Sequence, residues 1–122
     1  MIAGTSFSPA MAFIAFAHEF LDLVAMGEHG AALGRLDQRT VRWTRKRLQA
    51  AIDANTNRAG LCSRQGMTQS ACPCMEEVSP GVFVLSHRLP VAGKWAAAKA
   101  IFRFTQKAGT DYFHVELEAI EP

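Results

Sequence analysis

Apolar side chains near the start of the chain recur at steps of three and four residues, the spacing of one face of a helix. The residues of this stripe are Phe13, Phe16, Ala17, Phe20 and Val24. Ser8 can accept hydrogen bonds from free backbone N–H groups and Pro9 suits the first helical position, so the helix is predicted to begin at this pair. It is predicted to end near Met26-Gly27.

Two shorter helices are predicted before residue 56. The first turns three apolar side chains inward, and Asp37 closes it or caps the segment that follows. Those three side chains are Ala32, Leu33 and Leu36. The second begins at Thr44 and ends around Asn55, because its apolar residues again keep helical spacing. They are Leu48, Ala51 and Ile52.

The pattern changes after the helices. The segment 58–80 has no sustained period and is interrupted by glycine and proline, so a long loop with room for one short strand is predicted. From residue 81 the pattern alternates with period two, which predicts strands over 82–89, 96–105 and 112–119. Pro90 has no backbone N–H to donate and is expected to end the first of these strands, before a turn at 91–94.

The alternation assigns one face of each strand to the core. The predicted inward residues are Phe83, Leu85, His87 and Leu89, then Ala98, Ala100, Phe102 and Phe104, then Phe113, Val115, Leu117 and Ala119. The last two strands are predicted to pair antiparallel, which brings charged residues of their outward faces together. Lys99 and Arg103 are expected to meet Glu116 and Glu118.

These elements predict an α+β fold of one domain spanning residues 1–122. Helices occupy about 9–55, a loop about 56–80, and an antiparallel meander about 81–120. The phenylalanine stripe of the first helix is the expected cover for the apolar sheet face. The chain has 122 residues, 49% hydrophobic and 20% charged, a composition typical of a soluble globular domain with one core.

The sequence contains no predicted membrane or export segment. Its longest early apolar run, Ala10 to Ala17, is ended by His18 and Glu19 and is too short to span a bilayer. No basic residue precedes Arg35, whereas a secretory signal needs one before its apolar run. A cytoplasmic protein is therefore expected.

Several segments resemble small bacterial nuclear-transport-factor-2-like proteins of cystatin-like architecture. The segments are 20–33 with Leu36-Asp37, Gly93-Lys94-Trp95, 100–104 and 112–117. The resemblance implies a cone formed by helices packed on one face of a curved antiparallel sheet. In that superfamily the cone holds an enzyme pocket, a ligand site or a solid core, and dimers are common.

Three cysteines form the sharpest local cluster of potential ligands. Thiolates at Cys62, Cys72 and Cys74 would bind zinc or copper(I), with His87 or His29 as a fourth ligand. One C-x-C with a lone cysteine ten residues earlier departs from the paired C-x2-C spacing of structural zinc sites. A reactive thiol pair and ordinary thiols of a reducing compartment remain as alternatives.

His87 is the candidate for chemistry in a pocket, because the alternation places a polar ring on the inward face. It could act as a general base or ligand donor together with Tyr112 or Asp111. A core histidine bonded to a backbone carbonyl is the alternative. The opposite strand phase, with Val82 and Val84 inward, would place His87 in solvent.

A basic cluster precedes and opens the third helix. Its members are Arg39, Arg42, Trp43, Arg45, Lys46 and Arg47. Such a cluster suits nucleic acid or an acidic protein surface, or it is a solvated face with Trp43 in the core. The chain carries 13 Lys and Arg against 11 Asp and Glu, a net charge of +2, which argues against nucleic acid.

Motifs of common catalytic folds are missing from the sequence. It has no Gly-rich phosphate loop, no G-x-S-x-G and no H-E-x-x-H, and His18 with Asp22 supplies only two ligands for a metal. The leading hypothesis is therefore a binding protein without catalytic activity or cofactor that contacts a protein partner or a second copy of itself. The alternatives are a small-ligand binder or enzyme that uses His87, and a cysteine-based metal-binding protein.

Overall fold

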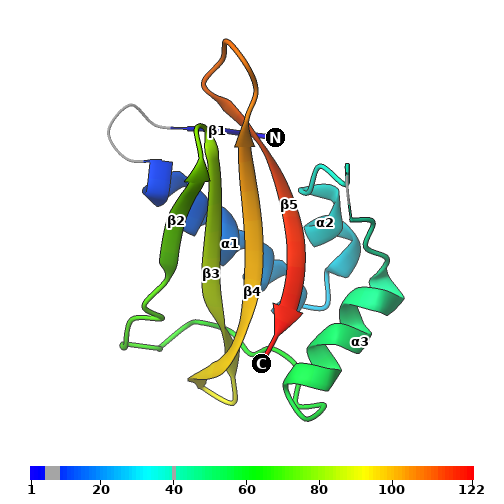
Figure 1. Cartoon of the computed structure of the whole chain (residues 1–122). Coiled ribbons are helices and arrows are strands. Elements are labelled where there is room, and N and C mark those ends of the chain that lie inside the picture. The colour runs from blue at the N-terminus through cyan, green and yellow to red at the C-terminus, as the bar shows by residue number, and fades with distance from the viewer. Residues whose placement is uncertain (5–8, 40) are drawn as a thin grey trace.

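A five-stranded antiparallel sheet forms the frame of the molecule, and one long helix crosses behind it (Figure 1). The computed structural model describes residues 1–4, 9–39 and 41–122. The helices are α1 (Pro9–Ala25), α2 (His29–Gly34) and α3 (Arg45–Asn55). The strands are β1 (Ile2–Ala3), β2 (Cys74–Ser79), β3 (Val82–Val91), β4 (Lys94–Gln106) and β5 (Tyr112–Glu121), in the sheet order β1-β5-β4-β3-β2. The predicted α+β class is confirmed.

The phenylalanine stripe of α1 covers the sheet as predicted. The rings of Phe13 and Phe104 stack with centroids 4.0 Å apart, and Phe16 and Phe20 meet Phe102 edge to face at 5.9 and 5.4 Å. Each such aromatic pair contributes about 0.5–1.5 kcal/mol beyond the area it buries. The helix begins at Pro9, whereas the cap predicted for Ser8 lies outside the described residues.

The inward faces of β3 and β4 follow the predicted alternation. Leu85, His87 and Leu89 are fully buried, as are Ala100, Phe102 and Phe104, and the alternative phase of β3 is wrong. Pro90 does not end β3. The ladder is irregular between Arg88 and Pro90, where three residues of β4, 96–98, lie opposite the single Leu89, and it continues to Val91. Proline is tolerated at such an irregularity because regular ladder bonding is interrupted there.

The prediction for Ala119 is wrong because β5 contains a bulge. Phe102 pairs with Leu117 but Ile101 pairs with Ala119, so Glu118 is an extra residue in β5. The extra residue reverses the alternation beyond it, and Ile120 packs against the core instead. Arg103 forms the expected ion pair with Glu118.

The expected role of Lys99 is also corrected by this register. Lys99 lies opposite Glu121 and not opposite Glu116 or Glu118. The reason is the register, which places Arg103 opposite Glu116, so that Lys99, four residues away along β4 and beyond the bulge, faces Glu121.

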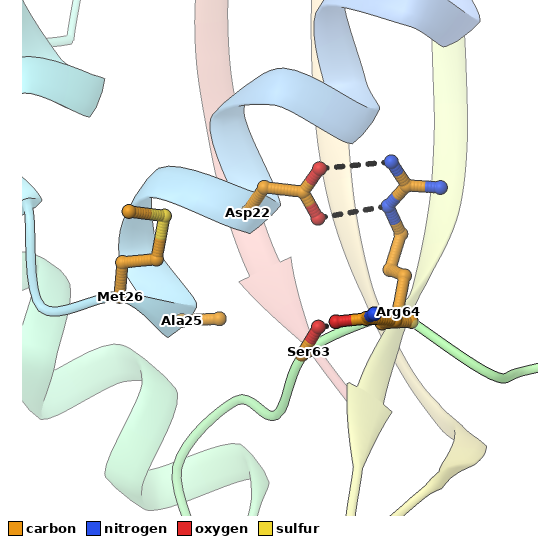
Figure 2. Close-up of a pocket in the computed structure, with 6 residues that line it drawn as sticks. Asp22, Ala25, Met26, Ser63 and Arg64 are labelled. Atoms are coloured by element: carbon orange, nitrogen blue, oxygen red, sulfur yellow. Dashed lines mark hydrogen bonds and ion pairs between the residues drawn. The ribbon is translucent and has the colours of Figure 1, made fainter.

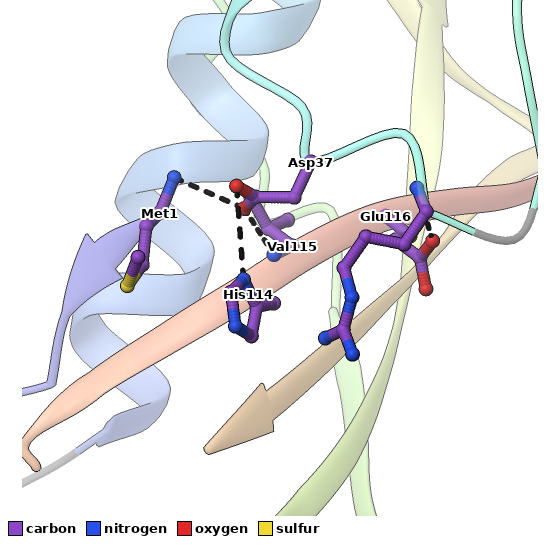
Figure 3. A network of polar contacts seen from close by, with 6 residues as sticks. Met1, Asp37, His114, Val115 and Glu116 are labelled. Atoms are coloured by element: carbon purple, nitrogen blue, oxygen red, sulfur yellow. Dashed lines mark hydrogen bonds and ion pairs between the residues drawn. The ribbon is translucent and has the colours of Figure 1, made fainter. Parts of the chain in front are cut away.

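The outer edge of β5 is bonded by side chains from the helical half of the chain. Asp37 and Val115 exchange two hydrogen bonds, one at 2.8 Å from the Asp37 N–H to the Val115 carbonyl and one at 2.9 Å from the Val115 N–H to Asp37 Oδ2 (Figure 3). The indole N–H of Trp43 donates to the Leu117 carbonyl at 2.6 Å, and Asn55 Nδ2 donates to the Ile120 carbonyl at 3.2 Å. Asp37 therefore secures β5, and the prediction that it closes or caps a helix is wrong.

The segment 58–80, for which the sequence predicts a long loop with room for one short strand, does contain one strand. This strand, β2, forms the edge of the sheet beside β3, and its ladder is irregular between Glu77 and Ser79. Across the parts of the chain that the structure describes, no helix has the length and apolar character needed to cross a bilayer.

Candidate functional site

His87 lies on the core face of β3, close to one end of the sheet, and is completely buried. Its ring packs edge to face against His18 of α1, with centroids 4.9 Å apart. On its other side it meets the indole of Trp95, at the start of β4, at 5.4 Å. A helix and two strands thus bring three polar aromatic rings together.

The hydrogen bonds of His87 define its protonation. Nδ1 lies 2.8 Å from the carbonyl oxygen of Arg88, and a carbonyl can only accept, so Nδ1 carries a proton. In a neutral ring Nε2 then bears a lone pair. This atom is buried and has no hydrogen-bond partner within the described part of the chain. A buried acceptor without a donor is uncommon in folded proteins and costs about 1–3 kcal/mol.

Both histidines of the cluster favour the neutral form. Burial lowers the pKa of His87 below 6.5, the bond to the Arg88 carbonyl opposes this shift in part, and the nearby Arg64 charge adds to it. Burial also lowers the pKa of His18, with further lowering from Arg64 and His87 and a smaller opposing effect of Asp22. At neutral pH both rings are therefore uncharged.

An ion pair anchors the loop that covers this cluster. Arg64 binds Asp22 of α1 through two hydrogen bonds, from Nε to Oδ1 at 2.9 Å and from Nη2 to Oδ2 at 2.8 Å (Figure 2). The parallel bonds match the fork of a guanidinium to a carboxylate, the strongest geometry for such a pair. The two charges of this ion pair cancel, so the surroundings of the histidines carry a net charge near zero.

The loop and α1 enclose a cavity of about 230 Å³ next to the histidines. His18, Arg64 and Trp95 line it together with Ile14, Met67 and Pro73 and with Gln69, Ser70 and Ala71. The carbonyl of Gln69 accepts a hydrogen bond from the Trp95 indole at 2.8 Å, which holds the loop against β4. His87 does not itself line the cavity, but its ring contacts those of His18 and Trp95, which do. Arg64 also lines a second hollow, of about 380 Å³, together with Asp22 and Met26 (Figure 2).

The structure does not bring Tyr112 or Asp111 to His87. Ile120 pairs with Ala100, which pairs with His87, whereas Tyr112 lies eight residues earlier in β5. At about 3.3 Å per residue this places Tyr112 roughly 26 Å away along the strand. Its side chain is exposed, and Asp111 lines a separate hollow at that far end.

The three cysteines are not gathered into a ligand set. Cys62 is half-buried and its sulfur accepts the Gly93 N–H at 3.3 Å, while Cys72 and Cys74 are exposed on the segment that enters β2. All three are free thiols. Within residues 1–4, 9–39 and 41–122 no group of three His, Cys, Asp or Glu side chains is placed to hold a metal ion.

The basic cluster divides into buried and exposed members. Trp43 is only 6% exposed, and the Arg47 guanidinium lies over its ring, 4.7 Å from the centroid. Arg39 is fixed through its backbone N–H, which donates to Glu116 at 2.9 Å (Figure 3). The side chains of Arg42, Arg45, Lys46 and Arg47 are exposed at the start of α3. Thr44, where the sequence predicts the helix to begin, is its N-cap and accepts a hydrogen bond from the Arg47 N–H.

Sequence reasoning identified His87 but missed most of its surroundings. His18 and Asp22 share a helix face one turn apart, and this spacing was a usable signal for a site on α1. Arg64 has no such signal, since it lies in the aperiodic segment and reaches a residue 42 positions away. No protein-family model, curated protein or solved structure matches the chain.

Proposed function

We propose that the chain binds a small uncharged molecule with a hydroxyl or amine group in the cavity beside His18 and Trp95. The observation that carries this proposal is the buried lone pair of His87 Nε2, for which no donor is found in the described part of the chain. A donor on a ligand would remove the cost of leaving this acceptor unpaired.

Charge and size narrow the class of ligand. Arg64 is compensated by Asp22 and both histidines are neutral, so a charged ligand would be buried without a counter-charge, which is unfavourable. The cavity volume of about 230 Å³ lies below the usual range for drug-sized ligands. It has room for on the order of ten non-hydrogen atoms.

His18 controls access to the acceptor in this proposal. It is half-buried, lines the cavity and packs against His87. In this proposal a change of the His18 side-chain rotamer opens the way for a ligand donor to reach Nε2 of His87. The apolar walls, including Ile14 and Trp95, then contact the remainder of the ligand.

The finer fold assignment is part of the same proposal. One long helix packed behind a five-stranded antiparallel sheet is compatible with the cystatin-like cone that the sequence resembles. In that superfamily the cone holds an enzyme pocket, a ligand site or a solid core, and we propose a ligand site for this chain. The cavity beside His18 and His87 lies between α1, the covering loop and β4.

Imidazole nitrogen NMR during a screen of small neutral alcohols, phenols and amides tests the proposal. Binding should shift the Nε2 resonance of His87 as it accepts a hydrogen bond. His87→Leu should abolish binding of the same compounds. His114→Leu is the matched control, because His114 Nδ1 is also buried without a hydrogen bond, at 3.8 Å from Asp37 Oδ1, and His114 lies outside the cavity. Compounds that bind both variants equally, or a screen in which the Nε2 resonance never moves, would refute it.

A further inference from the structure

Four exposed cations crowd the start of α3 and are called the basic corner here. They are Arg42, Arg45, Lys46 and Arg47. Within the described residues no carboxylate lies at ion-pair distance from any of them. Like charges this close repel one another, so the cluster does not serve the stability of the helix.

A surface hollow of about 330 Å³ adjoins the basic corner, between the start of α2 and α3. Arg45 and Lys46 line it together with His29, Gly30 and Gln49. Gly30 is required for its shape, because a side-chain carbon at that position would overlap the Arg45 guanidinium. The absence of a side chain on α2 thus lets Arg45 lie across the helix.

The neutral residues of the hollow are also held in place. Gln49 Nε2 donates to Asp53 Oδ1 at 2.7 Å, so the amide oxygen of Gln49 is the atom that faces His29. His29 Nε2 lies 2.6 Å from this oxygen and must donate to it. Arg45 and Lys46 therefore lie beside polar side chains that hydrogen bonds already hold in place. Less side-chain entropy is then lost when an anion binds.

We propose that the basic corner binds an acidic segment of a partner protein, with a carboxylate seated between Arg45 and Lys46. Nucleic acid is the weaker fit, because Trp43 is 6% exposed and Arg47 covers its ring, which leaves no aromatic face there for a base to stack on. The net charge of +2 is also small, whereas nucleic-acid-binding domains carry a broad basic surface. The hollow shares no residue with the cavity beside His18, so this inference stands independently of the proposed ligand site.

Fluorescence anisotropy of a labelled glutamate-rich octapeptide at low salt tests the proposal. The double variant Arg45→Glu with Lys46→Glu should bind the peptide at least about tenfold more weakly, since attraction becomes repulsion. Lys94→Glu with Lys107→Glu is the matched control, because it makes the same change in net charge at two exposed positions, the first residue of β4 and the β4–β5 connection. This control should change the affinity less than about twofold. Equal losses in the two variants would show attraction by net charge alone and overturn the proposal.

A pair of glycine variants distinguishes binding of the peptide in the hollow from its general attraction to the exposed cations. Gly30→Ala should displace the Arg45 guanidinium and weaken peptide binding several-fold, with the fold preserved because the end of a long side chain can move. Gly34→Ala, in the same helix with open space around it, should leave binding unchanged. Unchanged binding in Gly30→Ala would overturn the assignment of the hollow. A labelled uridine dodecamer that binds more tightly than the peptide, and loses binding in the Arg45→Glu, Lys46→Glu variant, would overturn the choice of a protein partner.

Discussion

The substitution His87→Leu should remove much of the acid sensitivity of the fold. Burial lowers the pKa of His87 below its ordinary value of 6.5, so the unfolded chain binds a proton below pH 6.5 that the folded chain does not. The free energy of unfolding is therefore highest above pH 6.5. It decreases as the pH falls from 6.5 towards the pKa of the folded state. A leucine at this position cannot take up the proton, and this contribution disappears.

The expected magnitude follows from one proton and two polar contacts. A difference of one bound proton changes the free energy of unfolding by at most about 1.4 kcal/mol per pH unit. At pH 7.5 the variant loses the hydrogen bond to the Arg88 carbonyl, which contributes about 0.5–1.5 kcal/mol, and is relieved of the unpaired Nε2, which costs about 1–3 kcal/mol. We therefore expect the stability of the variant at pH 7.5 to lie between about 0.5 kcal/mol below and about 2.5 kcal/mol above that of the wild type.

Urea unfolding followed by circular dichroism at pH 7.5, 6.5 and 5.5 measures both effects. Leu85→Ala is the control, because Leu85 is buried on the same face of β3 two residues away. It should lose about 2–5 kcal/mol at every pH while keeping the wild-type slope. The pKa of His18 is also lowered, so His18 adds a slope of its own in the wild type and in both variants. If His87→Leu kept the full wild-type slope between pH 6.5 and 5.5, the argument that His87 is buried in its neutral form would be refuted.

Two further substitutions test local features of the fold. Ala92 has a φ of 51° next to Gly93 in the β3–β4 turn, a backbone conformation that asparagine adopts more readily than alanine. Ala92→Asn should therefore raise the free energy of unfolding by about 0.5–1 kcal/mol in urea titrations, and a decrease would contradict the turn geometry. Burial tends to raise the pKa of Asp37, but the bond from the Val115 N–H and the Met1 ammonium outweigh it, and the pKa lies below 3.8. Asp37→Asn should therefore cost about 1 kcal/mol at pH 6, and the difference from wild type should shrink as the pH falls below 3.8, whereas a constant difference would count against the ionised carboxylate.

Features that depend on local periodicity could be predicted from the sequence. The stripe of α1 and the alternation along β3 and β4 are repeated over several residues, so each residue supports the assignment of its neighbours. The burial of His87 followed directly from that alternation. The strand β1 has no such support, because it is two residues long and is placed by pairing with Tyr112 and Phe113.

Features that depend on distant partners could not be predicted in the same way. The bulge at Glu118 is a property of the register between β5 and β4, and a single strand does not reveal its register. The ion pair of Arg64 with Asp22 joins an aperiodic loop to a helix. For the same reason the sequence suggests Tyr112 as a partner of His87 in a pocket, although the length of β5 separates the two residues.

The bonds along the outer edge of β5 determine where the sheet can grow. Asp37, Trp43 and Asn55 occupy backbone groups that a strand from another molecule would need for pairing. An added strand on this side must break those bonds first, so β5 is protected against edge-to-edge aggregation. The opposite edge, β2, presents exposed carboxylates at Glu76 and Glu77 and an irregular ladder. Two copies approaching through β2 would bring like charges together, so β2 and the part of β5 that β1 leaves uncovered both disfavour the addition of another strand.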